Sequence, residues 1–145
     1  MKVSIEEISK DREEEILIRC HEANDKIYEI IDRIQSDDPI LLGHWNDRIH
    51  RIKLSDIYYF EAVDGKVYMY GKENVFEIKH KLYELEEQFG ARRCFRASKS
   101  TVLNIAKISH VYPKISGRFE AVLDNGERVV ISRQYVPTLR NKLGL

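Results

Sequence analysis

Residues 57–68 read I-Y-Y-F-E-A-V-D-G-K-V-Y and predict a β-hairpin. Aromatic and β-branched residues, which favour strands, stand on both sides of the pair Asp64-Gly65. An Asp-Gly pair between two such runs is a strong hairpin signal, because both residues tolerate the positive φ angles of a two-residue turn. Lys66 follows the turn directly, so the hairpin should carry a cation close to its tip.

The chain from residue 40 onward continues this mixture of short apolar runs and turns. Several runs alternate between apolar and polar residues, as expected of strands whose successive side chains point to opposite faces. Asp124-Asn125-Gly126 predicts a second tight hairpin. A turn is expected at Gly43–Asp47, and the predicted strands are 48–54, 57–62, 67–70, 75–78, 108–112, 119–123 and 128–131. Two short helices are also predicted, one within 79–89 and one that Ser132 can cap, so the fold class is mainly β, or α+β overall.

The first 38 residues predict a small β-β-α extension, and residues 39–145 predict the main domain. Val3–Ile8 alternates in the manner of a short strand. Ile16–Cys20 predicts a second strand, in which Cys20 belongs to an apolar run and is expected in a core. A segment of this size is too small to bury a core alone.

The helix of the extension is predicted from isoleucines at helical spacing, namely Ile27, Ile30, Ile31 and Ile34. Asn24 or Asp25 suits its N-cap, and Ser36-Asp37-Asp38-Pro39 predicts its end. The apolar stripe needs a covering surface, which could be the main domain, a second copy of the chain or another protein. We favour a second copy, so the extension is predicted to be a dimerisation and regulatory element.

The charges of the chain are divided unequally between these two parts. The formal net charge is zero, which by itself argues against a nucleic-acid binder. Residues 1–38, however, carry twelve acidic and six basic residues, a net of −6, and residues 39–145 carry the opposite net of +6. Residues 92–145 alone hold eleven basic and three acidic residues. Such an asymmetry points to an anionic partner for the basic part, although solvated surface cations would give the same count.

No residue set in the sequence indicates an enzyme or a metal site. There is no Gly-rich phosphate loop, no H-E-x-x-H and no G-x-S-x-G. The two cysteines, Cys20 and Cys94, form neither a metal motif nor a disulfide framework. The histidines show no metal-ligand spacing; they are His21, His44, His50, His80 and His110. We therefore predict no catalytic residues, no cofactor, no metal and no small-molecule substrate.

The apolar content of the chain predicts a soluble protein. Met1–Asp11 is mixed and charged, unlike a signal peptide. No apolar run approaches the ~20 residues that a membrane span needs. A cytoplasmic protein is therefore expected.

Three basic and polar clusters fall at predicted turns or element ends. They are Asp64-Gly65-Lys66, Arg96-Ala97-Ser98-Lys99-Ser100 and Ser132-Arg133-Gln134. Lysine and arginine suit phosphate contacts, and arginine can also donate two hydrogen bonds to guanine in the major groove. Each cluster alone has a simpler explanation, since Ser132 can be only a helix cap and Lys66 only a solvated turn residue. Three such clusters in one basic, β-rich domain favour DNA binding.

Three motifs in one order carry a resemblance to a known family. They are I-Y-Y-F-E-A-V-D-G-K-V-Y (57–68), F-R-A-S-K-S-T-V-L-N (95–104) and D-N-G-E (124–127) with I-S-R-Q-Y-V (131–136). On these motifs, residues 39–145 resemble the LytTR family of DNA-binding domains. The resemblance implies an elongated β fold of about ten short strands with short helices. It also implies loops, rather than a recognition helix, that enter successive major grooves of double-stranded DNA and bend it.

The resemblance also implies which residues bind DNA. By matched position, Lys66, Lys99 and Arg133 fall in three DNA-contacting loops. The serines Ser98, Ser100 and Ser132 flank these loops and would bind phosphates. Arg96 is included in the predicted DNA-binding set, although it could equally be structural. Asn104, which is also part of the family pattern, is expected to fix a turn rather than to contact DNA.

The chain departs from the family's common pattern in two respects. The family often has histidine where this chain has Ser98, which puts a base contact there in doubt. The family's common context is a response regulator with a receiver domain, and residues 1–38 are far too short for one. The architecture instead resembles stand-alone LytTR regulators, which are often encoded beside a small membrane protein that restrains them.

The sequence therefore predicts a sequence-specific transcription regulator that binds paired promoter repeats as a homodimer. A small regulatory membrane protein is a further partner that the resemblance suggests. The alternative function is a protein-interaction module that acts through the acidic N-terminal segment. The two hypotheses are compatible, because the extension could serve both dimerisation and regulation.

Overall fold

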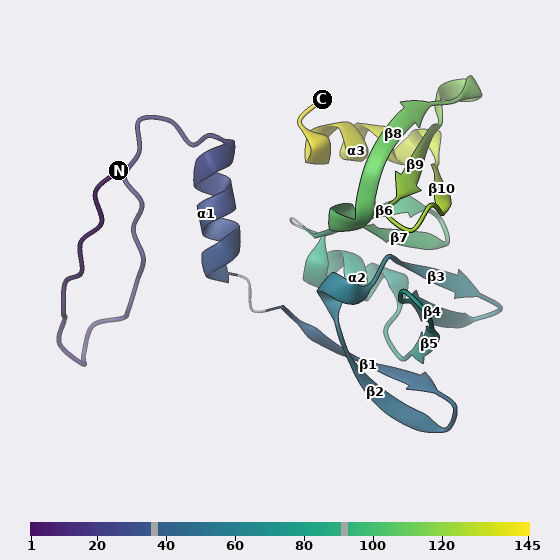
Figure 1. Cartoon of the computed structure of the whole chain (residues 1–145), viewed down its shortest axis with the longest axis horizontal. Helices are drawn as coiled ribbons and strands as arrows, with labels where there is room; N and C mark the ends of the chain where they lie inside the picture. The colour runs from purple at the N-terminus through teal and green to yellow at the C-terminus, as the bar shows by residue number, and fades with distance from the viewer. Residues whose placement is uncertain (36–37, 91–92) are drawn as a thin grey trace. The chain divides into compact units, whose positions relative to one another are not determined.

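The computed structural model describes residues 1–35, 38–90 and 93–145, without the side chains of residues 32, 33 and 35. The chain divides into two compact units, Met1–Asp37 and Asp38–Leu145 (Figure 1).

The unit Asp38–Leu145 contains a seven-stranded sheet in the order β2-β1-β5-β4-β3-β7-β6 and a three-stranded sheet in the order β10-β9-β8. Every neighbouring pair of strands is antiparallel. The mainly β fold with about ten strands is therefore confirmed for the described residues. The elements are β1 (Ile40–Trp45), β2 (Arg48–Lys53), β3 (Tyr59–Val63), β4 (Lys66–Tyr70), β5 (Val75–Ile78), α2 (Leu82–Phe89), β6 (Cys94–Ser98), β7 (Thr101–Asn104), β8 (Ile108–Pro113), β9 (Phe119–Leu123), β10 (Arg128–Ile131) and α3 (Val136–Leu143).

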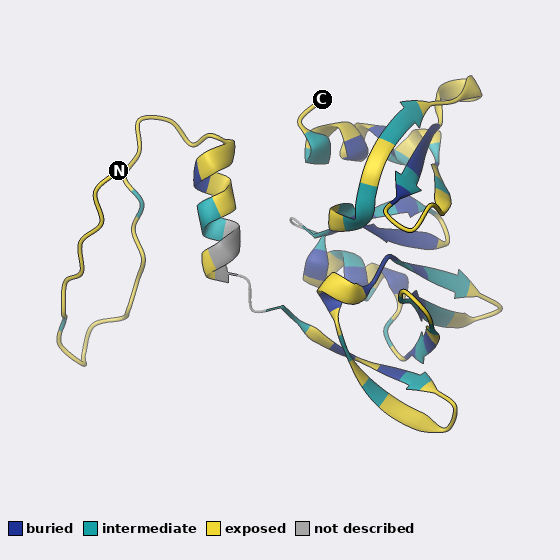
Figure 2. Cartoon of the chain, in the orientation of Figure 1, coloured by how far each residue is buried: buried dark blue, intermediate teal, exposed yellow. Residues whose placement is uncertain are grey.

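Two hydrophobic cores lie on opposite sides of the β6–β7 hairpin. One core contains Cys94 and Val102 and is completed by helix α2 and strands β3, β4 and β5. The other contains Phe95 and Leu103 and is completed by the three-stranded sheet and helix α3. Alternate residues of β6 and β7 therefore face different cores, as the strand period requires. The hairpin is buried on both faces (Figure 2), so its turn extends from a firmly held base.

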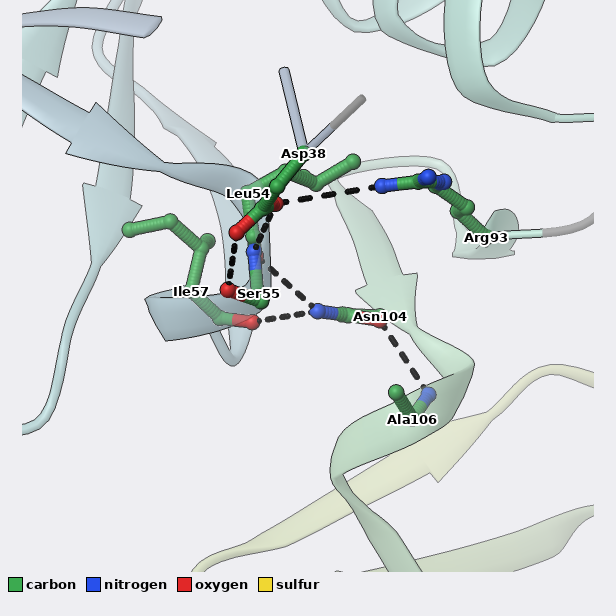
Figure 3. A network of polar contacts seen from close by, with 7 residues as sticks. All are labelled: Asp38, Leu54, Ser55, Ile57, Arg93, Asn104 and Ala106. Atoms are coloured by element: carbon green, nitrogen blue, oxygen red, sulfur yellow. Dashed lines mark hydrogen bonds and ion pairs between the residues drawn. The ribbon is translucent and has the colours of Figure 1, made fainter. Parts of the chain in front are cut away.

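Asn104 fixes two turns beside this hairpin, as the sequence analysis expected. Its side chain is 2% exposed, and its Nδ2 donates to the carbonyls of Leu54 (3.2 Å) and Ile57 (2.7 Å). Its Oδ1 accepts from the backbone N–H of Ala106 at 3.1 Å. Figure 3 shows this network beside the Asp38 carboxylate, which accepts hydrogen bonds from the backbone N–H and hydroxyl of Ser55. The buried amide thus joins β7 to the 3-10 turn before β3, because each of its polar atoms finds a backbone partner.

Two local predictions in this unit are wrong. The turn predicted at Gly43–Asp47 is shorter, because β1 continues to Trp45 and only Asn46 and Asp47 form the turn. Gly43 serves packing instead, since a Cβ there would lie 2.6 Å from Cβ of Phe76. Ser132 does not cap the last helix with its hydroxyl; its backbone carbonyl accepts from Tyr135 N–H at 2.8 Å instead.

The unit Met1–Asp37 contains helix α1 (Asp25–Gln35), which confirms the predicted helix. Asn24 is its N-cap residue, since its Oδ1 accepts from the backbone N–H of Ile27 at 3.2 Å. The predicted end at Ser36-Asp37 lies outside the described residues. Within the part of the chain that the structure describes, no helix combines the length and hydropathy of a membrane span.

The two strands predicted for the extension are wrong, because residues 3–8 and 16–20 adopt no regular secondary structure. Val3 and Ile5 are 86% and 94% exposed, and Ile16 and Leu17 are 69% and 68% exposed, so most apolar side chains of the two runs are not covered within the unit. A two-stranded ribbon without such support is marginal in water. Cys20 is exposed rather than part of a core, for the same reason.

Candidate nucleic-acid interface

The three predicted clusters meet along one edge of the unit Asp38–Leu145. Strand β3 pairs with β7, and the backbone N–H of Ala62 donates to the carbonyl of Ser100 at 2.8 Å. The backbone N–H of Ser132 donates to the carbonyl of Ala97, also at 2.8 Å. These two bonds join the β3–β4 turn to the β6–β7 turn, and the β6–β7 hairpin to the segment after β10. Figure 1 shows the ends of these hairpins on the same, right-hand side of the unit.

The first cluster is a tight turn that exposes Lys66. Asp64 and Gly65 have φ angles of 50° and 78°, as a two-residue hairpin turn requires. The Lys66 Nζ lies 3.9 Å from Oε1 of Glu77, and both side chains are about half exposed. An ion pair of this length between exposed groups stabilises the protein by only ~0–1 kcal/mol. Lys66 can therefore exchange this partner for an anionic ligand at little cost.

The second cluster is a turn whose internal hydrogen bonds leave Lys99 exposed. The backbone N–H of Ser100 donates to Oγ of Ser98 at 3.2 Å, and the two hydroxyl oxygens are 3.4 Å apart. Lys99 is exposed at the tip, and among the described residues its side chain has no hydrogen-bond or ion-pair partner. The serine hydroxyls thus shape the turn and remain on its surface, and the lysine alone extends from it.

The Arg96 side chain holds this second turn in position through hydrogen bonds to its backbone. Its Nε donates to the carbonyl of Ser98 at 2.8 Å and its NH2 to the carbonyl of Lys99 at 2.9 Å. Its NH1 lies 3.3 Å from Oε2 of Glu86 on helix α2. The guanidinium is therefore engaged on all three nitrogens within the protein. This geometry supports a positioning role for Arg96, one of the two roles that the sequence left open.

The third cluster places Arg133 at the surface beside the β8–β9 hairpin. The side chain before it, Ile131, is fully buried, and Ser132 is tied to β6 by its backbone. Arg133 then opens a 3-10 turn with its side chain exposed. The aliphatic part of Arg133 runs along Gly117, because a Cβ at Gly117 would lie 2.9 Å from its Cδ. The direction of the arginine is thus set by a contact with the neighbouring hairpin.

A hollow of about 310 Å³ lies between the second and third clusters, and both Ser98 and Ser132 line it. Tyr59, Glu61 and Arg128 also line it. Tyr59 stacks on Tyr70 with ring centroids 4.4 Å apart. Burial and the nearby carboxylate of Glu127 raise the pKa of Tyr59 well above its ordinary value, so its hydroxyl stays a neutral donor.

No motif in the sequence indicates Tyr59 or Arg128 as site residues. The alternation of residues 57–62 does place Tyr59 and Glu61 on one face of a strand. Their neighbours, however, come from β7 and β10, and these pairings are set by tertiary structure. No local pattern in the sequence shows that β3, β7 and β10 surround one hollow.

The cations of the last helix are occupied within the protein. The guanidinium of Arg140 lies over the ring of Phe119 at 5.2 Å from its centroid. Lys142 Nζ donates to the backbone carbonyl of Gly90. Helix α3 therefore offers fewer available cations than the three turns.

Within the described residues, no group of three His, Cys, Asp or Glu side chains could hold a metal ion.

Comparison with known proteins relates this chain to one family of DNA-binding domains. The model of the LytTr DNA-binding domain family matches residues 47–144. An uncharacterized HTH-type transcriptional regulator of Staphylococcus aureus (strain MSSA476) is 27% identical over 147 residues, which cover 100% of this chain and 99% of that protein. The sensory transduction protein LytT of Enterococcus faecalis is 28% identical over 99 residues, which cover 68% of this chain and 41% of LytT.

A solved structure is also similar to this chain. It is the LytTr DNA-binding domain of a Bacillus cereus protein, with a TM-score of 0.69 and 29% sequence identity. The alignment covers 73% of this chain and 97% of the solved domain.

Proposed function

Because the chain belongs to the LytTR DNA-binding domain family, its function is DNA binding in transcription regulation, and we propose that it recognises double-stranded DNA sequence-specifically through loops. Lys66, Lys99 and Arg133 contact the duplex in this proposal. Ser98, Ser100 and Ser132 bind phosphate oxygens beside them. Arg96 acts mainly by holding the second loop in position.

One observation carries this proposal: three cationic turns that are distant in sequence share one edge of the domain. The backbone hydrogen bonds of Ala62 with Ser100 and of Ser132 with Ala97 connect them. Phosphate contacts need exposed cations and hydroxyls, and base contacts need side chains that extend from a rigid base. Lys99 and Arg133 meet both requirements, since each extends from a turn anchored on buried strands.

The arrangement of the helices in this unit favours DNA recognition through loops over DNA recognition through a helix. A helix-turn-helix motif needs two consecutive helices joined by a short turn. Helices α2 and α3 are instead separated by the five strands β6 to β10. The cations of α3 are also engaged with Phe119 and Gly90. We therefore propose that the turns enter successive major grooves, and that the duplex bends to meet them.

The proposal is tested by selection from a randomised pool of duplex DNA at two salt concentrations, with sequencing of the retained fraction. Enrichment of a repeated motif, with affinity that falls as salt rises, is the expected result. The variant Arg133→Ala should enrich a motif with weaker base preference. Retention without enrichment would reduce the function to non-specific binding, and no retention at low salt would refute it.

We further propose that the protein binds DNA as a homodimer assembled through the unit Met1–Asp37. Within this unit, Ile8, Ile16 and Ile18 line a hollow together with Ile31 and Ile34 of helix α1. Ile34 remains 48% exposed, so the apolar stripe of α1 is incompletely covered within the unit. A second copy of the same unit would supply the missing apolar surface.

Deletion of residues 1–38 tests the homodimer. Light scattering should give a dimer for the full chain and a well-behaved monomer for residues 39–145. A dimer of the shortened chain would instead assign dimerisation to the DNA-binding domain.

The second candidate function is a protein-interaction module formed by the acidic extension. The same hollow is lined by Glu6, Glu7, Glu14 and Glu15, so its rim is strongly acidic. A basic protein partner, such as a small regulatory membrane protein, could bind there in place of a second copy. The proposal includes a cytoplasmic location in either case, since a transcription regulator must reach the chromosome.

A further inference from the structure

We propose that the tip of the β8–β9 hairpin, Lys114–Arg118, is a fourth DNA-contacting element, in which Ile115 and Arg118 contact the duplex beside the bases that Arg133 recognises. This inference rests on the proposed function and adds an element that none of the three sequence clusters contains. The tip is proposed to contact the sugar-phosphate backbone and the apolar groups in the groove of the same duplex.

The tip has a defined conformation. The backbone N–H of Lys114 donates to the carbonyl of Arg118 at 2.8 Å, which closes the loop. Ser116 and Gly117 follow each other with φ angles of 65° and 75°. Two consecutive left-handed residues reverse the chain sharply and hold Ile115 away from the sheet. The hairpin therefore presents Ile115 at its end as a fixed feature.

Ile115 is exposed to an unusual degree. At 81%, it is the most exposed large apolar side chain among the described residues of the unit Asp38–Leu145. Single exposed apolar residues are common on protein surfaces, so the position of this one decides its interpretation. It lies at a hairpin end between Lys114 and Arg118 in sequence, two residues before Gly117, which lies against Arg133. Aliphatic side chains in such a place can contact deoxyribose or the methyl group of thymine.

The two cations of the tip differ in availability. Lys114 Nζ lies 2.9 Å from Oε2 of Glu120, whose side chain is 8% exposed, so this lysine is neutralised within the protein. The Arg118 side chain is exposed and has no hydrogen-bond or ion-pair partner among the described residues. Arg118 is therefore the cation of the tip that can bind a phosphate.

Gly117 joins the tip to the proposed recognition residue. The Cβ of any other residue there would lie 2.9 Å from Cδ and 3.1 Å from Cγ of Arg133. The tip and Arg133 are thus in direct van der Waals contact, and a duplex that meets Arg133 comes within reach of the tip. Gly117 acts as a positioning residue, since its missing side chain leaves room for the arginine.

The direct contacts are tested in the full-length protein with Ile115→Ser and Arg118→Gln, on the duplex that the wild-type protein enriches from the random pool. Ile115→Ser should weaken binding about tenfold, the effect of losing the burial of much of one aliphatic side chain. Arg118→Gln should lower the slope of log affinity against log salt by about 0.9. Wild-type affinity and slope in both variants would overturn the inference. Absence of DNA binding by the wild-type protein would instead refute the proposed function.

The positioning role is tested with Gly117→Asn against the matched control Gly126→Asn. Both glycines lie at hairpin turns with positive φ, which asparagine tolerates better than most residues, but a Cβ at Gly126 meets nothing within 4 Å. Because the backbone strain at a positive φ is similar at the two positions, both variants should lose a similar free energy of unfolding. Only Gly117→Asn should change base preference in the selection, at the positions that Arg133→Ala also changes. An unchanged preference for Gly117→Asn, or an equal change for both variants, would overturn the role.

Discussion

Replacement of Arg96 by methionine separates positioning from direct DNA contact. Methionine keeps much of the aliphatic stem of arginine and removes the guanidinium. The variant loses two hydrogen bonds to backbone carbonyls, those of Ser98 at 2.8 Å and Lys99 at 2.9 Å, and one ion pair with Glu86 at 3.3 Å. The whole interaction lies beneath the β6–β7 turn, so its loss should loosen the turn that carries Lys99.

The loss of stability depends on how far the Arg96 side chain is exposed to water. A hydrogen bond from a charged group contributes about 1.5–3 kcal/mol when buried, and the Arg96 side chain is 19% exposed. Water can replace part of the lost bonds, and the ion pair with the more exposed Glu86 adds at most ~1 kcal/mol. We expect Arg96→Met to lower the free energy of unfolding by about 2–3 kcal/mol. With a urea m-value of about 1.5 kcal/mol/M, the unfolding midpoint should fall by about 1.3–2 M.

The DNA assay then distinguishes the two roles. Arg96→Met should weaken binding to the selected duplex and leave the salt slope unchanged, because Arg96 neutralises no phosphate. Lys99→Met is the matched comparison, with an unchanged unfolding midpoint and a slope lower by about 0.9. If Arg96→Met instead lowers the slope by that amount and leaves the midpoint unchanged, Arg96 contacts phosphate and the positioning argument is wrong.

Three further perturbations have defined outcomes. Arg133→Ala should lose about 1–3 kcal/mol of discrimination at the bases it contacts, measured by sequencing the selected pool; unchanged preference would contradict base contact. Asn104→Ala should lower the free energy of unfolding in urea by about 3 kcal/mol, because the Ile57 carbonyl and the Ala106 N–H lose their Asn104 partner and the Leu54 carbonyl keeps only the N–H of Ile57. Hydrogen bonds from Tyr112 and then Lys114 lower the pKa of Glu120, so its contribution to stability is present above the unfolded-state pKa of about 4.3 and is lost as pH falls through the lower folded-state value. Glu120→Gln should therefore flatten the acid side of the Tm–pH profile, and an unchanged profile would refute that assignment.

The sequence predicts the strands of the DNA-binding domain well where a local signal is strong. The turn Asp64-Gly65 and the segment ending in Asn125-Gly126 both form hairpin connections. The strand bounds 75–78, 119–123 and 128–131 agree with β5, β9 and β10. The two hairpin turns have one cause, since a glycine with positive φ between two β-prone runs fixes a turn locally. The family resemblance rested on the same segments and is confirmed.

The arrangement of the candidate interface could not be predicted in the same way. Periodicity shows which face of a strand is apolar, but it does not show that β7 lies beside β3 or that Ser132 binds β6. The two roles of Arg96 looked equal in sequence, because a cation before a turn can bind a phosphate or a carbonyl. The contact of Gly117 with Arg133 joins two segments that no motif connects. Such features depend on tertiary pairing, which single-sequence patterns do not contain.

The extension shows the opposite case, in which a clear pattern does not produce the predicted element. Alternation at residues 3–8 is sufficient to mark one apolar side, but a strand also needs a partner strand and a covered face. Val3, Ile5, Ile16 and Leu17 are each more than two-thirds exposed, and full burial of one such side chain contributes about 1.5–3 kcal/mol. The two runs can therefore form stable strands only if a surface outside their own unit buries these apolar side chains. A second copy can supply that surface and pair the two runs as strands, which is why we assign dimerisation to this part of the chain.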